Sequence, residues 1–140
     1  MTVTGLVRFS VSMDARLLER FDRFIAEKGY TSRSEALRDL IRDSLVESEW
    51  AAGDREVVGV VSLLYDHHTR GLSESLTAVQ HEYNTVVTTV HVHLDHQHCF
   101  EALVVKGKAA VIREMADRLG SLKGVKHARV TLGSSGKDLP

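Results

Sequence analysis

The residues with the clearest chemistry lie in one short run of the chain. His91, His93 and Cys99 fall within nine residues, and seven of the eight histidines lie between residues 67 and 98. Side chains two apart on a strand share one face, so His91 and His93 can bind the same ion, and a turn returns Cys99 to that face. Imidazole and thiolate donors suit Zn, Cu, Ni or Fe and do not suit Ca or Mg. The run therefore predicts a transition-metal site.

The residues alone leave the fourth ligand and the metal open. Structural sites usually have four donors, and tetrahedral zinc is the default for such a set. Each residue taken singly has a plainer interpretation, since a lone cysteine is usually a small buried apolar residue. The combination favours a metal. The nearest candidates for the fourth donor are His81, His96, His98 and His67.

Composition limits the classes of protein that fit. The single cysteine excludes an intrachain disulfide framework. No apolar run approaches the roughly 20 residues of a membrane span, and no cleavable signal pattern is present, so we expect a cytoplasmic protein with no membrane partner. The formal net charge of −1 gives no general sign of nucleic-acid binding.

The apolar pattern of the second half of the chain is typical of an α+β domain. Alternation over residues 85–94 places His91 and His93 on one face of a strand, and Val90 and Val92 on the other face. The expected order is βαββαβ, the ferredoxin-like or ACT-like arrangement. Its elements are a strand at 56–66, a helix at 69–82, strands at 85–94 and 101–106, a helix at 109–119 and a strand at 125–132.

The first half predicts one strand followed by two helices. Residues 7–13 alternate strictly between apolar and polar side chains, and residues 14–28 carry apolar residues at helical spacing up to Gly29. Residues 32–35 form a capping box for a helix that reaches about Trp50. Gly53 and Asp54 then break the pattern. We therefore expect a β-α-α domain at 1–52 and a βαββαβ domain at 53–140.

A single strand has no partner for its backbone, and about 50 residues bury little surface. Antiparallel pairing of two such strands in a dimer solves both problems. The paired strands would present a polar ribbon of Arg8, Ser10 and Ser12, and such a ribbon fits the major groove of DNA. The start of the second helix, at Ser32 and Arg33, would offer N–H groups to a phosphate.

A plainer alternative is that these three polar residues only solvate an edge strand. Residues 1–53 hold eight Lys or Arg and nine Asp or Glu, so this region is not basic. Non-specific DNA affinity should then be weak, and binding should need a factor that improves it. Residues 7–50 nevertheless resemble the ribbon-helix-helix DNA-binding family.

The two halves in this order resemble the NikR family of nickel-responsive regulators, over residues 7–138. The resemblance rests on Arg-Ser-Glu-Ala-Leu-Arg-Asp at 33–39, Tyr-Asp-His at 65–67, Gln-His-Glu-Tyr at 80–83, His-Val-His at 91–93 and Cys-Phe-Glu at 99–101. It implies a ribbon-helix-helix dimer joined to an ACT-like domain, with four chains assembled through those domains. It also implies Ni(II) held square-planar by three histidines and one cysteine at a tetramer interface.

Carried over to this sequence, the resemblance makes His91, His93 and Cys99 ligands from one subunit and His81 the ligand from its neighbour. The segment between Gln80 and His91 is one residue shorter than the family pattern, around Asn84 and Thr85.

Further positions match supporting roles in the family. Tyr65 and Glu101 correspond to residues whose hydrogen bonds orient the ligands. Glu35 and Asp39 correspond to an interdomain cation site, for which a solvated helix face is the alternative. The base-reading strand corresponds to Arg8, Ser10 and Ser12, where the family often has threonine.

The resemblance implies a nickel-responsive repressor, a homotetramer that binds a palindromic double-stranded operator and controls nickel uptake genes. One alternative is a ribbon-helix-helix repressor that responds to an amino acid or to another transition metal. A metalloenzyme is disfavoured, because three histidines and a cysteine fill the coordination positions that catalysis needs open. A further alternative is another ribbon-helix-helix protein, such as an antitoxin.

Overall fold

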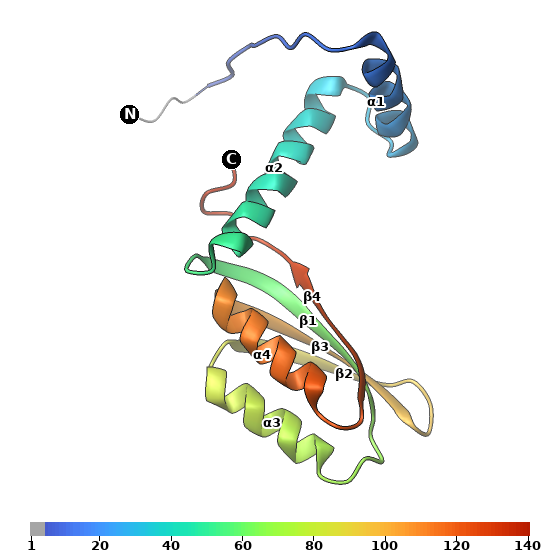
Figure 1. Cartoon of the computed structure of the whole chain (residues 1–140), viewed down its shortest axis with the longest axis vertical. Helices are drawn as coiled ribbons and strands as arrows, with labels where there is room; N and C mark the ends of the chain where they lie inside the picture. Colours follow the sequence, from blue (N-terminus) through green and yellow to red (C-terminus); the bar gives the residue numbers. More distant parts are fainter. Residues whose placement is uncertain (1–4) are drawn as a thin grey trace. The chain divides into compact units, whose positions relative to one another are not determined.

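The computed structural model describes residues 5–140 and divides into two compact units between Ile41 and Arg42, inside the second helix (Figure 1). None of the helices in this described range is long and apolar enough to cross a membrane. The elements are α1 (Ala15–Glu27), α2 (Arg33–Ala52), β1 (Glu56–Asp66), α3 (Leu72–Tyr83), β2 (Val86–His93), β3 (His98–Lys108), α4 (Ala109–Ser121) and β4 (Val125–Leu132).

The second unit confirms the predicted ferredoxin-like order. Its sheet has the strand order β2-β3-β1-β4 with every neighbouring pair antiparallel. Helices α3 and α4 lie side by side on one face of this sheet (Figure 1). Every second residue of β1 is buried, as expected for a strand with one face against helices. The core between the layers includes Val57, Val61, Leu63, Leu76, Leu103, Ile112, Met115 and Leu119.

Strand β3 begins earlier than its apolar pattern predicted. The sequence indicated a strand over 101–106, whereas β3 starts at His98, so that Cys99 lies within the sheet. A tight turn makes this possible, because Asp95 Oδ1 accepts hydrogen bonds from the backbone N–H of Gln97 at 2.8 Å and of His98 at 2.7 Å. An aspartate that accepts from backbone groups two and three residues ahead closes a turn locally.

The first unit contains α1 and the first part of α2, and both of these predicted helices begin at side-chain caps. Asp14 Oδ1 accepts from Arg16 N at 2.8 Å at the start of α1. Ser32 Oγ accepts from Glu35 N at 3.2 Å at the start of α2, which is the serine half of the predicted capping box. Gly29 follows α1 with a φ of 89°, a conformation that favours glycine.

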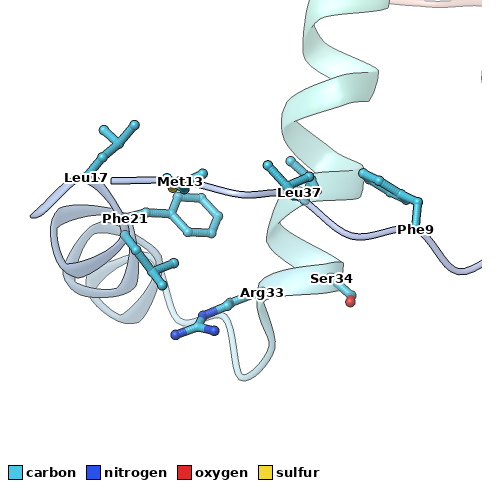
Figure 2. Close-up of a pocket in the computed structure, with 9 residues that line it drawn as sticks. Phe9, Met13, Leu17, Phe21, Arg33, Ser34 and Leu37 are labelled. Carbon is cyan, nitrogen blue, oxygen red and sulfur yellow. The ribbon is translucent and has the colours of Figure 1, made fainter. Parts of the chain in front are cut away.

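The predicted strand at 7–13 is not formed in the single chain. Residues 6–14 belong to no helix or strand, and Phe9, Val11 and Met13 are 70%, 61% and 45% exposed. A strand needs a partner for its N–H and C=O groups, and one chain supplies none here. These side chains line a hollow of about 720 Å³ together with apolar residues of both helices (Figure 2). The apolar residues that line the hollow are Phe9, Val11, Met13, Leu17, Leu18, Phe21 and Leu37.

Packing at the end of α2 predicts that a larger residue at Gly59 would destabilise the fold. A Cβ at Gly59 would lie 2.8 Å from the Trp50 ring and 2.8 Å from the Thr131 carbonyl oxygen. Trp50 is fully buried and donates from Nε1 to the Gly133 carbonyl at 3.0 Å, so its ring cannot move aside. We expect Gly59→Ala to lower the free energy of unfolding by about 1–3 kcal/mol, measured by urea denaturation of the metal-free protein. Ser62→Ala on the same strand, as the control, should change it by less than about 0.5 kcal/mol. Equal stability of Gly59→Ala and wild type would contradict this packing.

Candidate metal centre

Strand register brings the predicted ligands onto one face of the sheet. In the β2–β3 ladder His91 lies opposite Glu101 and His93 lies opposite Cys99, and in the β1–β3 ladder Tyr65 also lies opposite Cys99. Because cross-strand pairs share a face, all five side chains lie on the side that α3 and α4 cover. The two histidines are on the edge strand and are exposed, while Cys99 is fully buried.

Three donor atoms converge at this edge. His93 Nδ1 lies 3.2 Å from Cys99 Sγ. Donor atoms of His67, His93 and Cys99 all lie within 4.8 Å of one another. The His91 ring centroid is 4.9 Å from that of His93. Metal–nitrogen and metal–sulfur bonds of about 2.0–2.3 Å span such separations, so the donor set fits one transition-metal ion.

His67 joins the cluster from the segment that follows β1. Its backbone N–H donates to the Gln97 carbonyl at 3.0 Å, and its Nε2 contacts the His96 carbonyl oxygen. Its ring lies 5.5 Å from that of His93. Among the histidines that the sequence left open as a fourth donor, His67 is the one that the described structure places within reach inside the same chain.

His98, at the end of the turn, makes its contacts with residues outside this cluster of donors. His98 Nδ1 lies 2.9 Å from Asp95 Oδ2, and His98 Nε2 lies 2.9 Å from Lys126 Nζ. The hydrogen bond with His98 is the largest of the contacts that lower the pKa of Asp95 below its ordinary value. Asp95 was not among the residues predicted for the site. Its signal in the sequence is its position just before the backbone groups that its side chain binds.

Tyr65 connects the predicted supporting residues. Its buried hydroxyl donates to Glu101 Oε2 at 3.2 Å and lies 3.3 Å from His91 Nδ1. Burial, followed by the charge of Glu101 and their hydrogen bond, raises the pKa of Tyr65 above its ordinary value. The phenol therefore stays neutral, and its contact with Nδ1 leaves Nε2 of His91 available as the metal donor.

The buried thiol has a raised proton affinity. Burial raises the pKa of Cys99 above its ordinary value, and the negative charges of Glu101 and Asp95 raise it further. Metal ions bind the thiolate form of cysteine, so metal binding at Cys99 would release this proton.

His81 lies apart from the other predicted ligands within this chain. It is exposed in the last turn of α3 and does not belong to the cluster of donors found among residues 5–140. It follows the buried Val79 by two positions, about 200° around the helix, so it points away from its own core. It borders a shallow hollow with Gln80, Asn84 and Val86.

The residues predicted to meet DNA lie in the first unit. Arg8, Ser10 and Ser12 are exposed in the segment before α1. Arg33 Nε and Nη2 each lie 2.8 Å from an oxygen of Asp22, so its side chain pairs within its own chain, while Ser32 caps α2.

The two acidic residues predicted for an interdomain cation also lie in the first unit. Asp39 Oδ2 accepts from the Tyr30 hydroxyl at 2.6 Å, and Glu35 is exposed.

Two family models match the chain. Residues 58–132 match the NikR C-terminal nickel-binding domain, and residues 7–48 match the ribbon-helix-helix proteins of the copG family. The chain belongs to the NikR family. The predicted family is thereby confirmed, and with it a ribbon-helix-helix domain followed by a nickel-binding α+β domain.

Full-length relatives agree with this assignment. A candidate nickel-responsive regulator of Solibacter usitatus is 51% identical over 98% of this chain and 99% of its own length. Proteins of the same description from Thermococcus kodakarensis and Geobacter sulfurreducens are 50% and 52% identical, over 96% and 95% of this chain and 98% and 96% of their own lengths. The uncharacterised Thermotoga maritima protein TM1266 shares the fold, with a TM-score of 0.50 and 12% identity over 56% of this chain and 98% of its own.

The Tyr65 contacts predict a loss of nickel affinity on removal of one hydroxyl. We expect Tyr65→Phe to weaken nickel binding about tenfold, because His91 and Glu101 both lose the group that orients them. Competition with a chelator of known affinity measures the change. Tyr30→Phe in the first unit is the matched control and should leave affinity unchanged. Wild-type affinity in Tyr65→Phe would show that this hydroxyl does not support the site.

The raised pKa of Cys99 predicts a pH-dependent affinity. Because the thiol is protonated in the metal-free protein near neutral pH, nickel affinity should rise about tenfold from pH 7 to pH 8, for one proton released. Titration calorimetry in buffers of different ionisation enthalpy counts the protons released. An affinity independent of pH between 7 and 8 would show that the thiolate is not a ligand.

Proposed function

We propose that this NikR-family chain is a nickel-responsive repressor in which Ni(II) binding promotes operator binding. The observation that carries the proposal is the convergence of soft donors on the edge of the domain that matches the nickel-binding family model. The relatives are described as regulators, and the second matched region is a DNA-binding class. A regulator that binds both nickel and DNA accounts for both halves.

His91, His93 and Cys99 would bind the ion from one chain, and His81 would complete the site from a neighbouring chain. The first three share one face of adjacent strands, whereas His81 is exposed and turned away from its own core. A planar set of three imidazoles and a thiolate favours Ni(II) or Cu(II). When bound, the metal would supply a cross-link between two chains.

His67 is the competing donor within the same chain. Its imidazole already lies in the cluster with His93 and Cys99. A site completed by His67 would need no second chain, and nickel binding would then be independent of assembly. Separate replacement of His67 and His81 distinguishes these two ligand sets.

The exposed N-terminal apolar face supports a dimer through the ribbon. Phe9, Val11 and Met13 are largely exposed around an open hollow in the single chain. Antiparallel pairing with the same segment of a second chain would bond the backbone of both strands and close the hollow. The opposite faces, with Arg8, Ser10 and Ser12, would then form the ribbon that reads base edges in the major groove.

The open face of the sheet supports a further assembly through the second unit. Val90, Val92, Leu94 and Phe100 are between 38% and 57% exposed on this uncovered side. Contiguous exposed apolar residues of this kind mark interaction surfaces. Packing against other copies would give the homotetramer, and fixing that assembly with nickel would favour one spacing of the two ribbons on a palindromic operator. Nickel uptake genes are the proposed targets.

The central test is the nickel dependence of DNA binding. We expect Ni(II) to strengthen binding of an operator fragment, selected from genomic DNA by nickel-loaded protein, by at least about tenfold in fluorescence anisotropy titrations. Cys99→Ser and His93→Ala should remove this response and the thiolate-to-nickel charge-transfer absorption, and they should keep the native circular dichroism.

His81→Ala and His67→Ala decide the fourth ligand in the same assay. Loss of the square-planar spectrum in His81→Ala alone would support the intersubunit site, and loss in His67→Ala alone would replace it with an intrachain site. Operator affinity that is the same with and without nickel would overturn the repressor mechanism.

A further inference from the structure

The last turn of α3 is held by a side chain of the neighbouring helix. Arg118, on α4, contacts Glu82 Oε2 through Nη1, and its Nη2 lies 3.4 Å from Glu82 Oε1. Its Nη1 also donates to the Tyr83 hydroxyl at 3.2 Å, and its guanidinium carbon lies 5.5 Å from the centre of the Tyr83 ring. One guanidinium therefore binds both residues that directly follow His81.

The chain after these residues is also fixed. Asn84 ends α3 in a left-handed conformation with a φ of 50° and a ψ of 36°. The Thr85 hydroxyl contacts Met115 Sδ of α4 at 3.4 Å, and the Thr85 carbonyl accepts from Lys106 N of β3 at 2.8 Å. Only residues 82–85 separate His81 from β2, so the constraints on this segment act directly on the turn that carries His81.

Because the Arg118–Glu82 pair is exposed, it can orient the end of α3 while contributing little to the free energy of unfolding. The two side chains are 44% and 55% exposed, and ion pairs in water contribute little to the free energy of unfolding. The planar guanidinium instead fixes direction, because it binds both carboxylate oxygens and lies against an aromatic ring at the same time. A lysine would keep the charge and lose this fixed geometry.

We propose that Arg118 is a positioning residue for the metal site, which orients the last turn of α3 so that His81 projects toward a neighbouring chain. The inference rests on the proposed role of His81 as the intersubunit ligand. In the described contacts Arg118 touches none of the predicted ligands. Its partners Glu82 and Tyr83 directly follow His81 in α3, so its effect should act through His81.

The test is a double-mutant cycle on nickel affinity. Arg118→Gln should weaken nickel binding by about tenfold in the otherwise wild-type chain and by less than about twofold in the His81→Ala background. Arg118→Lys should fall between Arg118→Gln and wild type. The matched control is Arg113→Gln, an arginine of the same helix whose guanidinium lies over the Trp50 ring, and it should keep wild-type affinity.

Two further measurements exclude a general structural effect. The metal-free Arg118→Gln protein should keep its thermal midpoint and oligomeric state, and the backbone amides of residues 80–85 should exchange hydrogen faster than in wild type. Equal weakening of nickel binding by Arg118→Gln in both backgrounds would overturn the proposal, as would wild-type affinity of Arg118→Gln. If His81→Ala alone leaves nickel affinity and spectrum unchanged, the intersubunit ligand itself is wrong, and that result is separate from a failure of Arg118.

Discussion

The register of β3 between its two neighbours is the constraint on which the metal centre depends. It places Cys99 opposite Tyr65 on one side and opposite His93 on the other, with Glu101 opposite His91 one rung away. A slip of β3 by one residue would turn Cys99 and Glu101 to the other face of the sheet, away from Tyr65 and the two histidines. The buried alternation of β1 and the Asp95 turn hold this register, since both fix which residues of β3 face the helices.

In the proposed assembly, both functional regions of this chain would be completed by another copy. At the metal centre, buried Cys99 and exposed His93 meet at a strand on the edge of the sheet, while His81 faces outward from α3. Near the N-terminus, an alternating segment exposes its apolar face and forms no strand. Such a protein would be suited to couple assembly to metal and DNA, because each site would gain its missing partners from another chain.

Much of the fold followed from periodicity. Alternation in residues 85–94 and the apolar spacing of 109–119 predicted β2 and α4, because one buried face imposes a fixed period on a strand or a helix. The early start of β3 was missed, since it depends on hydrogen bonds that backbone N–H groups donate to Asp95 and not on apolar pattern. The strand predicted at 7–13 is not formed in the single chain, because local alternation describes a strand's faces and cannot supply its hydrogen-bonding partner. The match of residues 7–48 to the ribbon-helix-helix proteins agrees with the predicted ribbon.

The sequence by itself determined the kind of chemistry: a cluster of imidazoles beside one thiol, in a chain whose motifs resemble the NikR family. Donor type selects the class of metal without any knowledge of the fold. Only the tertiary structure decided which donors meet. It brought His67 to His93 and Cys99, and it placed Arg118 against the end of α3. His67 and His93 are 26 positions apart and Tyr83 and Arg118 are 35 apart, so each pair can meet only through sheet register or helix packing. Distances of that kind are set by the packed core, which no local pattern encodes.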